Sequence, residues 1–185
     1  MKKLLLMIVL FCGAVAVSHA QEFKAFRFDG GLGYAMPFSD GTDAGVLVYL
    51  EPKYAVASNI SVGFRWEGAI TASVALDGSE SKADAKLNQS FMATGDYFFT
   101  NNTFRPFAGL GVGAYSLAGA TANINNTTTS LVEDQTNFGL MLRAGFDASH
   151  FRLTVEYNFA GKDSRDESYN YLGIAIGFYI GGGKK

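Results

Sequence analysis

The sequence predicts an all-β fold, an eight-stranded antiparallel up-and-down transmembrane β-barrel that is preceded by a signal peptide. Three observations lead to this prediction. The first 20 of the 185 residues have the composition of a secretion signal. The remaining residues alternate between apolar and polar positions and show no period of 3.6 residues. The spacers between the alternating segments are short and long in turn, which is typical of membrane barrels.

The first segment is a processing signal. Lys2 and Lys3 give it a positive start, and Leu4 to Val17 is an apolar run without a charge. Ser18-His19-Ala20 then places small residues at the two positions that a signal peptidase reads. A retained membrane anchor is the alternative, but the run is short for the ~20 residues of a spanning helix. We therefore predict a signal peptide at 1–20 and an outer-membrane β-barrel domain at 21–185.

The cleavage predicted before Gln21 leaves a mature chain without cysteine. The single cysteine, Cys12, follows Phe11 inside the apolar run, where a lipoprotein signal needs a small residue. No disulfide and no cysteine metal site is therefore expected. The 15 basic and 17 acidic residues become 13 and 17 once Lys2 and Lys3 are removed, a formal net charge of −4. No basic surplus points to nucleic acid as a partner.

Eight segments of alternating apolarity follow the signal. They lie near 23–38, 45–56, 60–71, 87–99, 104–117, 137–148, 151–160 and 169–181. Most reach the ~9–11 residues that a tilted strand needs to cross the hydrocarbon. The short spacers are 57–59, 100–103 and 149–150, and the long ones are 39–44, 72–86, 118–136 and 161–168. With short turns at the periplasmic end, both chain ends are expected on the periplasmic side.

Each of the first four segments divides into two faces, because side chains alternate along a strand. The apolar faces carry Phe26, Phe28, Leu32 and Tyr34; Val46, Val48, Leu50, Tyr54 and Val56; Ile60, Val62, Phe64, Trp66 and Ile70; and Leu87, Phe91, Ala93 and Tyr97. The opposite faces carry Arg27, Asp29, Gly31 and Gly33; Tyr49, Glu51 and Lys53; Ser61, Gly63, Arg65 and Glu67; and Asn88, Ser90, Thr94 and Asp96.

The last four segments divide in the same way. Their apolar faces carry Ala108, Leu110 and Val112; Phe138, Leu140, Leu142, Ala144 and Phe146; Phe151, Leu153, Val155, Tyr157 and Phe159; and Leu172, Ile174, Ile176, Phe178 and Ile180. Their opposite faces carry Arg105, Gly109, Gly111 and Gly113; Arg143, Gly145 and Asp147; Arg152, Thr154, Glu156 and Asn158; and Tyr171, Gly173, Ala175 and Gly177.

Alternation alone does not say which face lies inside, because a soluble lipocalin-like barrel has the same period with apolar side chains inward. Glycine concentrates on the polar face, where a narrow eight-stranded lumen needs small residues. The same face carries only one lysine, Lys53, whereas a soluble exterior favours abundant mixed charge. Both features favour a membrane barrel with its polar face inside.

The polar face carries six cations and six carboxylates. The cations are Arg27, Lys53, Arg65, Arg105, Arg143 and Arg152, and the carboxylates are Asp29, Glu51, Glu67, Asp96, Asp147 and Glu156. Buried charges are tolerable only when they are paired and hydrogen-bonded, and arginine pairs with carboxylates through two parallel bonds. We hypothesise that these twelve residues form a network that plugs the lumen.

Other chemical motifs have plainer explanations. Gly109 to Gly113 lacks the spacing and the following helix of a nucleotide-binding loop. His150, the only histidine after residue 20, lies in a short turn near Ser149 and Asp147, which suggests a hydrolase triad, yet the predicted topology puts it at the periplasmic end. A turn residue is the favoured interpretation, and one histidine cannot build a multi-histidine metal site.

Two pairs of carboxylates resemble glycosidase acid–base pairs, Glu51 with Glu67 and Asp147 with Glu156. Each has an arginine or lysine nearby on the same face, so charge pairing is the favoured interpretation. The sequence thus assigns no catalytic, cofactor-binding or metal-binding residue, and no cofactor. The hydrophilic spacers are either solvated loops or surfaces for an unidentified ligand.

Four stretches resemble the small outer-membrane barrels of the OmpX and OmpA-transmembrane type, and most of all the porin-family outer membrane β-barrel proteins of Bacteroidetes. They are 50–54, 59–67, 105–111 and 171–180. The final strand is followed by Gly-Gly-Gly-Lys-Lys instead of the terminal aromatic residue of many such barrels. No peptidoglycan-binding domain follows, so cell-wall tethering is not implied.

The resemblance implies a location in the cell outer membrane, with outer-membrane lipid, lipopolysaccharide and the barrel assembly machinery as partners. A monomer without enzymatic activity, with a structural or surface-interaction role, is the favoured expectation. A small channel or lateral-diffusion route for small or hydrophobic solutes, as in OmpW-like barrels, is the alternative, although such a route calls for an apolar lumen. A lipid-modifying enzyme that uses His150 is a third hypothesis.

Overall fold

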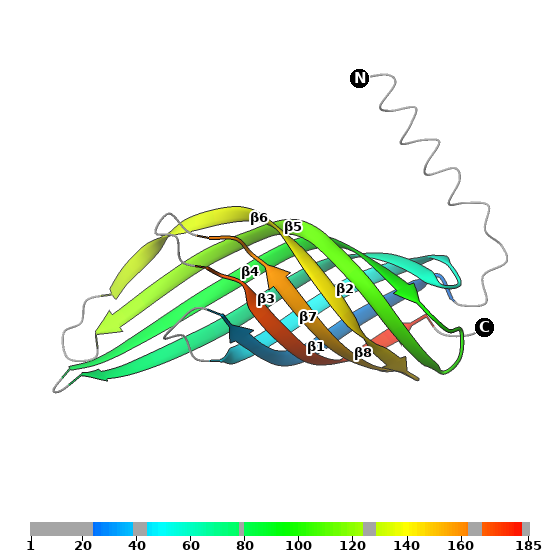
Figure 1. The fold of residues 1–185 in the computed structure, drawn as a ribbon, viewed down its shortest axis with the longest axis horizontal. Coiled ribbons are helices and arrows are strands. Elements are labelled where there is room, and N and C mark those ends of the chain that lie inside the picture. Colours follow the sequence, from blue (N-terminus) through cyan, green and yellow to red (C-terminus); the bar gives the residue numbers. More distant parts are fainter. Residues whose placement is uncertain (1–23, 39–43, 78–79, 124–128, 163–167, 183–185) are drawn as a thin grey trace, which may run out of the picture.

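The chain closes into a barrel in which each strand pairs with the next and β1 pairs with β8 (Figure 1). The computed structural model describes residues 24–38, 44–77, 80–123, 129–162 and 168–182. All pairings are antiparallel. The predicted eight-stranded antiparallel barrel is therefore confirmed. The predicted signal peptide at 1–20 lies outside the described residues.

The eight strands follow one another without a crossover. Their bounds are β1 Phe26–Pro37, β2 Gly45–Ala57, β3 Ile60–Asp77, β4 Glu80–Phe98, β5 Phe104–Asn123, β6 Thr129–Ala148, β7 Phe151–Phe159 and β8 Tyr171–Gly181. The described residues contain no helix long and apolar enough to cross a membrane.

Strands β3 to β6 run far beyond their predicted ends. The stretches 72–86 and 118–136 were expected to be loops, but β3 and β4 pair up to Asp77 and Glu80, and β5 and β6 pair up to Ala122 and Thr129. The prediction failed because it required a regular apolar face, which these stretches lack, whereas backbone hydrogen bonding between strands does not need one. The four strands project past the rest of the barrel, at the end away from the two termini (Figure 1).

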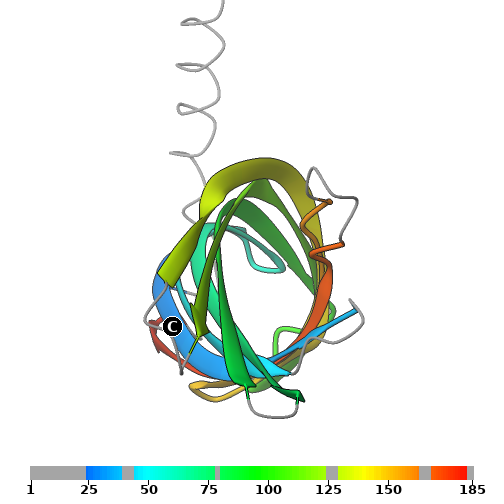
Figure 2. The same ribbon diagram turned by 90° about the vertical axis from the view of Figure 1, so that its left-hand side faces the viewer.

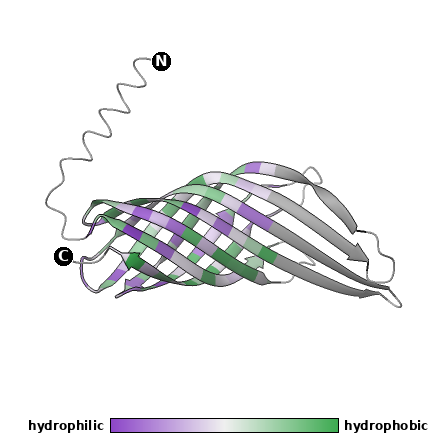
Figure 3. Ribbon diagram, turned by 180° about the vertical axis from the view of Figure 1, so that it is seen from behind, coloured by the Kyte–Doolittle hydropathy of each residue, from purple (hydrophilic) through white to green (hydrophobic). Residues whose placement is uncertain are grey.

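The two faces of the barrel wall separate by burial as the alternation predicts. Outward apolar side chains are widely exposed, with Phe138 at 81 % and Ile180 at 79 %. Inward residues are closed off in a narrow interior, which the view along the barrel makes visible (Figure 2). Hydrophobic and hydrophilic positions alternate along the strands over the terminus-bearing part of the wall (Figure 3). So much exposed apolar surface costs about 25 cal/mol per Å² in water, so the outer face is suited to lipid.

Glycines on the inner face make room for large side chains. A Cβ at Gly31 would lie 2.6 Å from the Tyr49 ring, and one at Gly139 would lie 2.5 Å from the Tyr115 ring. Both tyrosines are fully buried. The glycine enrichment of the polar face thus reflects how tightly the lumen is filled.

The ends of the barrel differ in their connections. Turns at 58–59, 99–103 and 149–150 lie at the end that carries both described chain ends (Figure 1). Ser149 has a positive φ of 57°, which a tight turn between β6 and β7 requires. At the same end, the register between β2 and β3 shifts between Ala55 and Ala57, a bulge that widens the wall there.

Two glycine substitutions test the close packing of the wall. A Cβ at Gly33 would lie 2.5 Å from the Ile174 carbonyl oxygen and 2.8 Å from the Ala175 Cα, so Gly33→Ala forces the backbone to shift. We expect a loss of about 1–3 kcal/mol in the free energy of unfolding. A Cβ at Gly95 meets nothing within 4 Å, so Gly95→Ala is the matched control and should be neutral or stabilising.

Urea unfolding in lipid vesicles, followed by the fluorescence of Trp66, the only tryptophan, measures both variants. Equal unfolding midpoints for the two variants would show that the wall yields at Gly33 without cost.

Candidate functional site

The lumen gathers all twelve charged residues singled out by the sequence. Each lies on the inner face, and none is more than 7 % exposed. They come from seven of the eight strands, because β8 presents Tyr171, Gly173, Ala175, Gly177 and Tyr179 to the interior. The period of two residues along each strand is enough to bring them together.

The end of the lumen nearest the termini is organised around Arg27. Its guanidinium donates from Nε and Nη2 to the two carboxylate oxygens of Asp29, both at 2.6 Å. Its third nitrogen donates to Asp147 on β6, also at 2.6 Å. Asp147 accepts a further bond from Arg152 at 3.2 Å. One arginine thus joins β1 to β6 across the lumen.

Asp96 and Glu51 occupy the middle of the lumen. Asp96 accepts hydrogen bonds from Lys53 at 2.7 Å, Arg143 at 2.8 Å and Arg152 at 2.8 Å. Arg143 also grips Glu51 through two bonds of 2.9 and 2.7 Å. Because each of these carboxylates serves several cations from different strands, the middle of the lumen is a continuous network of charge-assisted hydrogen bonds.

Arg65 organises the other end of the network. It donates from Nε to Glu67 at 2.8 Å and from Nη2 to Glu67 at 2.5 Å. The same Nη2 lies 2.9 Å from both carboxylate oxygens of Glu156 on β7. The Tyr171 hydroxyl donates to the second oxygen of Glu67. Arg65 thus connects β3 to β7, while its Nη1 lies 3.5 Å from Glu51 in the middle of the lumen.

Aromatic rings cover the faces of four guanidinium groups. The Arg27 guanidinium lies 3.9 Å from the centre of the Tyr179 ring, and that of Arg65 lies 3.9 Å from the Tyr49 ring. The list is completed by Arg152 on Phe107 at 3.7 Å and Arg105 on Phe98 at 3.9 Å. The planar cations are thereby paired at their edges and packed at their faces.

The sequence interpretation missed most of these rings as members of the site. Phe98 and Phe107 lie two residues after Asp96 and Arg105, so their position on the inner face was available as a signal. Above the network, the Tyr115 hydroxyl donates to Asn158 at 2.7 Å and lies 3.2 Å from the Met92 sulfur. These residues close the upper lumen with a mainly apolar layer.

Arg105 lies at the terminus-bearing mouth of the lumen. Its Nη2 donates to the Ser58 carbonyl oxygen at 2.9 Å, and its Nε lies 3.4 Å from the Thr100 carbonyl oxygen. These contacts tie the guanidinium to the two turns that follow β2 and β4. Arg105 therefore belongs to the mouth of the lumen as well as to its charged lining.

The features that suggested catalysis are separated by the structure. His150 is exposed in its turn, where its Nδ1 lies 3.1 Å from the Tyr179 carbonyl oxygen. Asp147, the acid of the suggested triad, points into the lumen and is held by Arg27 and Arg152. Glu51, Glu67 and Glu156 are likewise engaged by arginines. Across the described segments, no group of three or more histidine, cysteine or acidic residues is arranged to hold a metal ion.

Comparisons with known proteins agree with this fold. The family described as an outer membrane protein β-barrel domain matches residues 4–181. Among solved structures, the attachment invasion locus protein Ail of Yersinia pestis is 13 % identical, with a TM-score of 0.56 over 85 % of this chain and 99 % of that one. Neisserial surface protein A is 16 % identical, with a TM-score of 0.58 over 86 % and 98 %.

A third solved structure is the outer membrane protein OprG of Pseudomonas aeruginosa. It is 16 % identical, with a TM-score of 0.53 over 87 % of this chain and 98 % of that one. At these identities the solved structures are similar in fold. No curated protein sequence matches the chain significantly.

Removing Arg143 tests whether the lumen depends on pairing. Arg143→Met leaves Glu51 and Asp96 without their shared partner, and we expect a loss of about 3–5 kcal/mol in the free energy of unfolding. Adding Glu51→Gln restores the balance of charge, so the double variant should recover part of that loss. Urea unfolding measures both. A single variant within about 1 kcal/mol of the unaltered protein would contradict the network's role.

Proposed function

The chain belongs to the outer membrane protein β-barrel family, and on that premise we propose that it is a non-enzymatic barrel with a charge-plugged lumen and a structural or surface-interaction role. Its place is the cell outer membrane. The wall separates lipid-facing from inward side chains, and the network fills the interior. Neither feature offers a substrate pocket.

The observation that carries the proposal is the pairing of opposite strands. In a closed ring of eight, β2 lies opposite β6, and β3 lies opposite β7. Glu51 of β2 is bound by Arg143 of β6, and Arg65 of β3 is bound to Glu156 of β7. Ion pairs between opposite strands must cross the lumen. A solute would have to break buried charge pairs to pass, which costs several kcal/mol for each pair.

The alternative function, a small channel or a lateral route, is less consistent with this lining. A route for hydrophobic solutes needs an apolar lumen, and the middle of this lumen is occupied by carboxylates and guanidinium groups. A water-filled channel needs charges separated by open space, and here they are in direct hydrogen-bond contact.

The surface-interaction role rests on the projecting part of β3 to β6. The pairing of β2 with β3 ends at Val46 and Ile70, and that of β6 with β7 ends at Leu140 and Phe159. Among the described strands, no neighbour follows β3 over 71–77 or β6 over 129–139 on those sides. An unpaired strand edge offers backbone donors and acceptors to an extended segment of another protein.

The proposed partners follow from the faces of the barrel. The apolar exterior suits outer-membrane lipid and lipopolysaccharide, and the inward-outward pattern of β8, with Ile176, Phe178 and Ile180 outside, suits recognition by the barrel assembly machinery. The closed hydrogen-bonded wall leaves no edge within the apolar band, so a monomer is sufficient.

Conductance tests the plug. The refolded protein in a planar lipid bilayer should show no steady open conductance, because paired charges cross its lumen. Arg65→Ala combined with Arg143→Ala removes two of the crossing side chains and should increase ion leakage. Lys162→Gln, at the far end and exposed, is the matched control and should leave the baseline unchanged. Heat-modifiable gel mobility checks that each variant is folded. A large, steady conductance of the unaltered protein would overturn the plug.

Shortening the projecting strands tests the surface role. Replacing residues 73–84 by Asn-Gly joins β3 and β4 with a tight turn and leaves the lumen residues in place. Cells that carry the full-length protein should adhere to wells coated with casein, a disordered protein that offers extended segments, and cells with the shortened protein should not. Equal adhesion, with equal amounts of protein in the outer membrane, would contradict the role assigned to this edge.

A further inference from the structure

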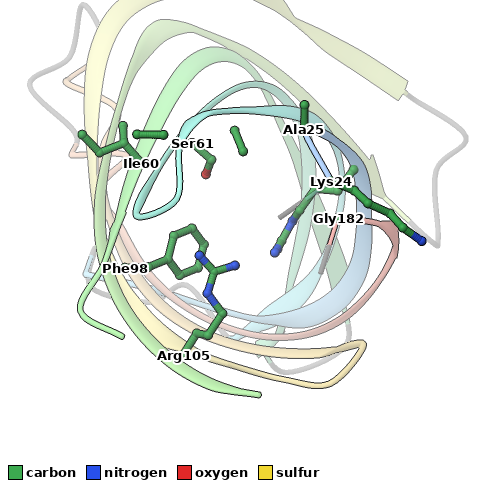
Figure 4. A pocket seen from close by; sticks show the side chains of 10 residues that line it. Lys24, Ala25, Ile60, Ser61, Phe98, Arg105 and Gly182 are labelled. Carbon is green, nitrogen blue, oxygen red and sulfur yellow. The ribbon is translucent and has the colours of Figure 1, made fainter. Parts of the chain in front are cut away.

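The terminus-bearing mouth of the lumen contains a small pocket beside the bulge of β2. It holds about 20 Å³, enough for a water-sized group, and opens at the end of the barrel. Figure 4 shows Ser61, Phe98 and Arg105 directed towards this opening. The register shift between Ala55 and Ala57 widens the wall at this point. Bulges of this kind are often found next to functional sites.

One polar group of the pocket is unsatisfied. The Ser61 hydroxyl is buried, the residue being only 5 % exposed, and it finds no hydrogen-bond partner within the described part of the chain. Buried hydroxyl groups are nearly always hydrogen-bonded, so an unsatisfied one needs an explanation. Its position in a pocket that opens outward indicates that the partner comes from outside the chain.

The titratable residues that line the pocket are all basic. They are Lys24, Arg27 and Arg105, and no carboxylate is among the described lining residues. Arg27 is balanced from the inner side by Asp29 and Asp147. The Arg105 guanidinium is held in place by the Ser58 carbonyl oxygen and by the face of Phe98, 3.9 Å away. A fixed guanidinium beside a hydroxyl is a favourable pair of donors for an oxyanion.

We propose that this pocket binds a single oxyanion group, a carboxylate or a phosphate, with Arg105 and the Ser61 hydroxyl as its donors and Lys24 at its rim. The pocket is too small for more than one such group, so it takes a free ion or the anionic end of a larger molecule at that face of the membrane. The proposal does not depend on whether the lumen is plugged.

A titration followed by NMR tests the proposal. The isotope-labelled protein in a non-ionic detergent is titrated with sodium phosphate and with sodium acetate, against sodium chloride of matched ionic strength. The Ser61 and Gly182 amide signals and the Arg105 Nε–Hε signal should shift and reach a plateau with phosphate and acetate. Shifts that grow linearly, or that chloride reproduces, would overturn the proposal.

Variants identify the donors. Arg105→Gln should weaken binding by about tenfold or more, because a charge-assisted bond is lost, and Ser61→Ala should weaken it by about fivefold. Ser90→Ala is the matched control, since the Ser90 hydroxyl is also buried and unsatisfied but lies outside the pocket. Lys162→Gln controls for the loss of one positive charge. Unchanged affinity in Arg105→Gln, or equal effects of the two serine variants, would overturn the proposal.

Adding phosphatidylglycerol to the micelles distinguishes the sources of the oxyanion. If the lipid shifts the same signals as free phosphate, the group belongs to a lipid headgroup. If only the free ions do so, the site takes a soluble anion. In both cases the plateau with free phosphate is what supports the site itself.

Discussion

The structure depends on the pairing of charges inside a closed wall. A barrel strand turns every second side chain inward, and eight strands enclose a lumen that side chains fill almost completely. A charge in that space cannot be left without a partner, because its desolvation costs several kcal/mol. The inward arginines and carboxylates are therefore arranged so that Asp96 alone receives Lys53, Arg143 and Arg152. The ion pairs that satisfy this requirement also brace opposite strands.

The same alternation makes the exterior apolar. Outward side chains such as Phe64, Leu142 and Ile176 are about half exposed and have no protein partner layer in the described fold. They would be unfavourable in water and are favourable in hydrocarbon. One period along the chain thus accounts for both the membrane location and the charged interior. The projecting ends of β3 to β6 are free of this requirement.

Much of the wall could be predicted from the sequence, since a period of two fixes the face of each residue. Arg65 and Glu67 were placed inside on that basis. Their partners could not be predicted, because Arg65 reaches Glu156 through the stagger of strands that are 91 residues apart. The long ends of β3 to β6 were missed because the apolar face stops near Ile70. The rings of Phe107 and Tyr179 were missed because aromatic residues were expected to face lipid, whereas here they stack on arginines.

The closure of the lumen is the central claim, and the reactivity of one inward cysteine tests it most directly. Thr154 points inward from β7, is 1 % exposed, and lies 3.3 Å from the Arg152 Nε. In protein that starts at Gln21, Thr154→Cys is the only thiol. In lipid vesicles, a small charged thiol reagent should modify it far more slowly than it modifies the unfolded chain. Modification at the rate of the unfolded chain would mean that water and ions fill the lumen, and would contradict the account.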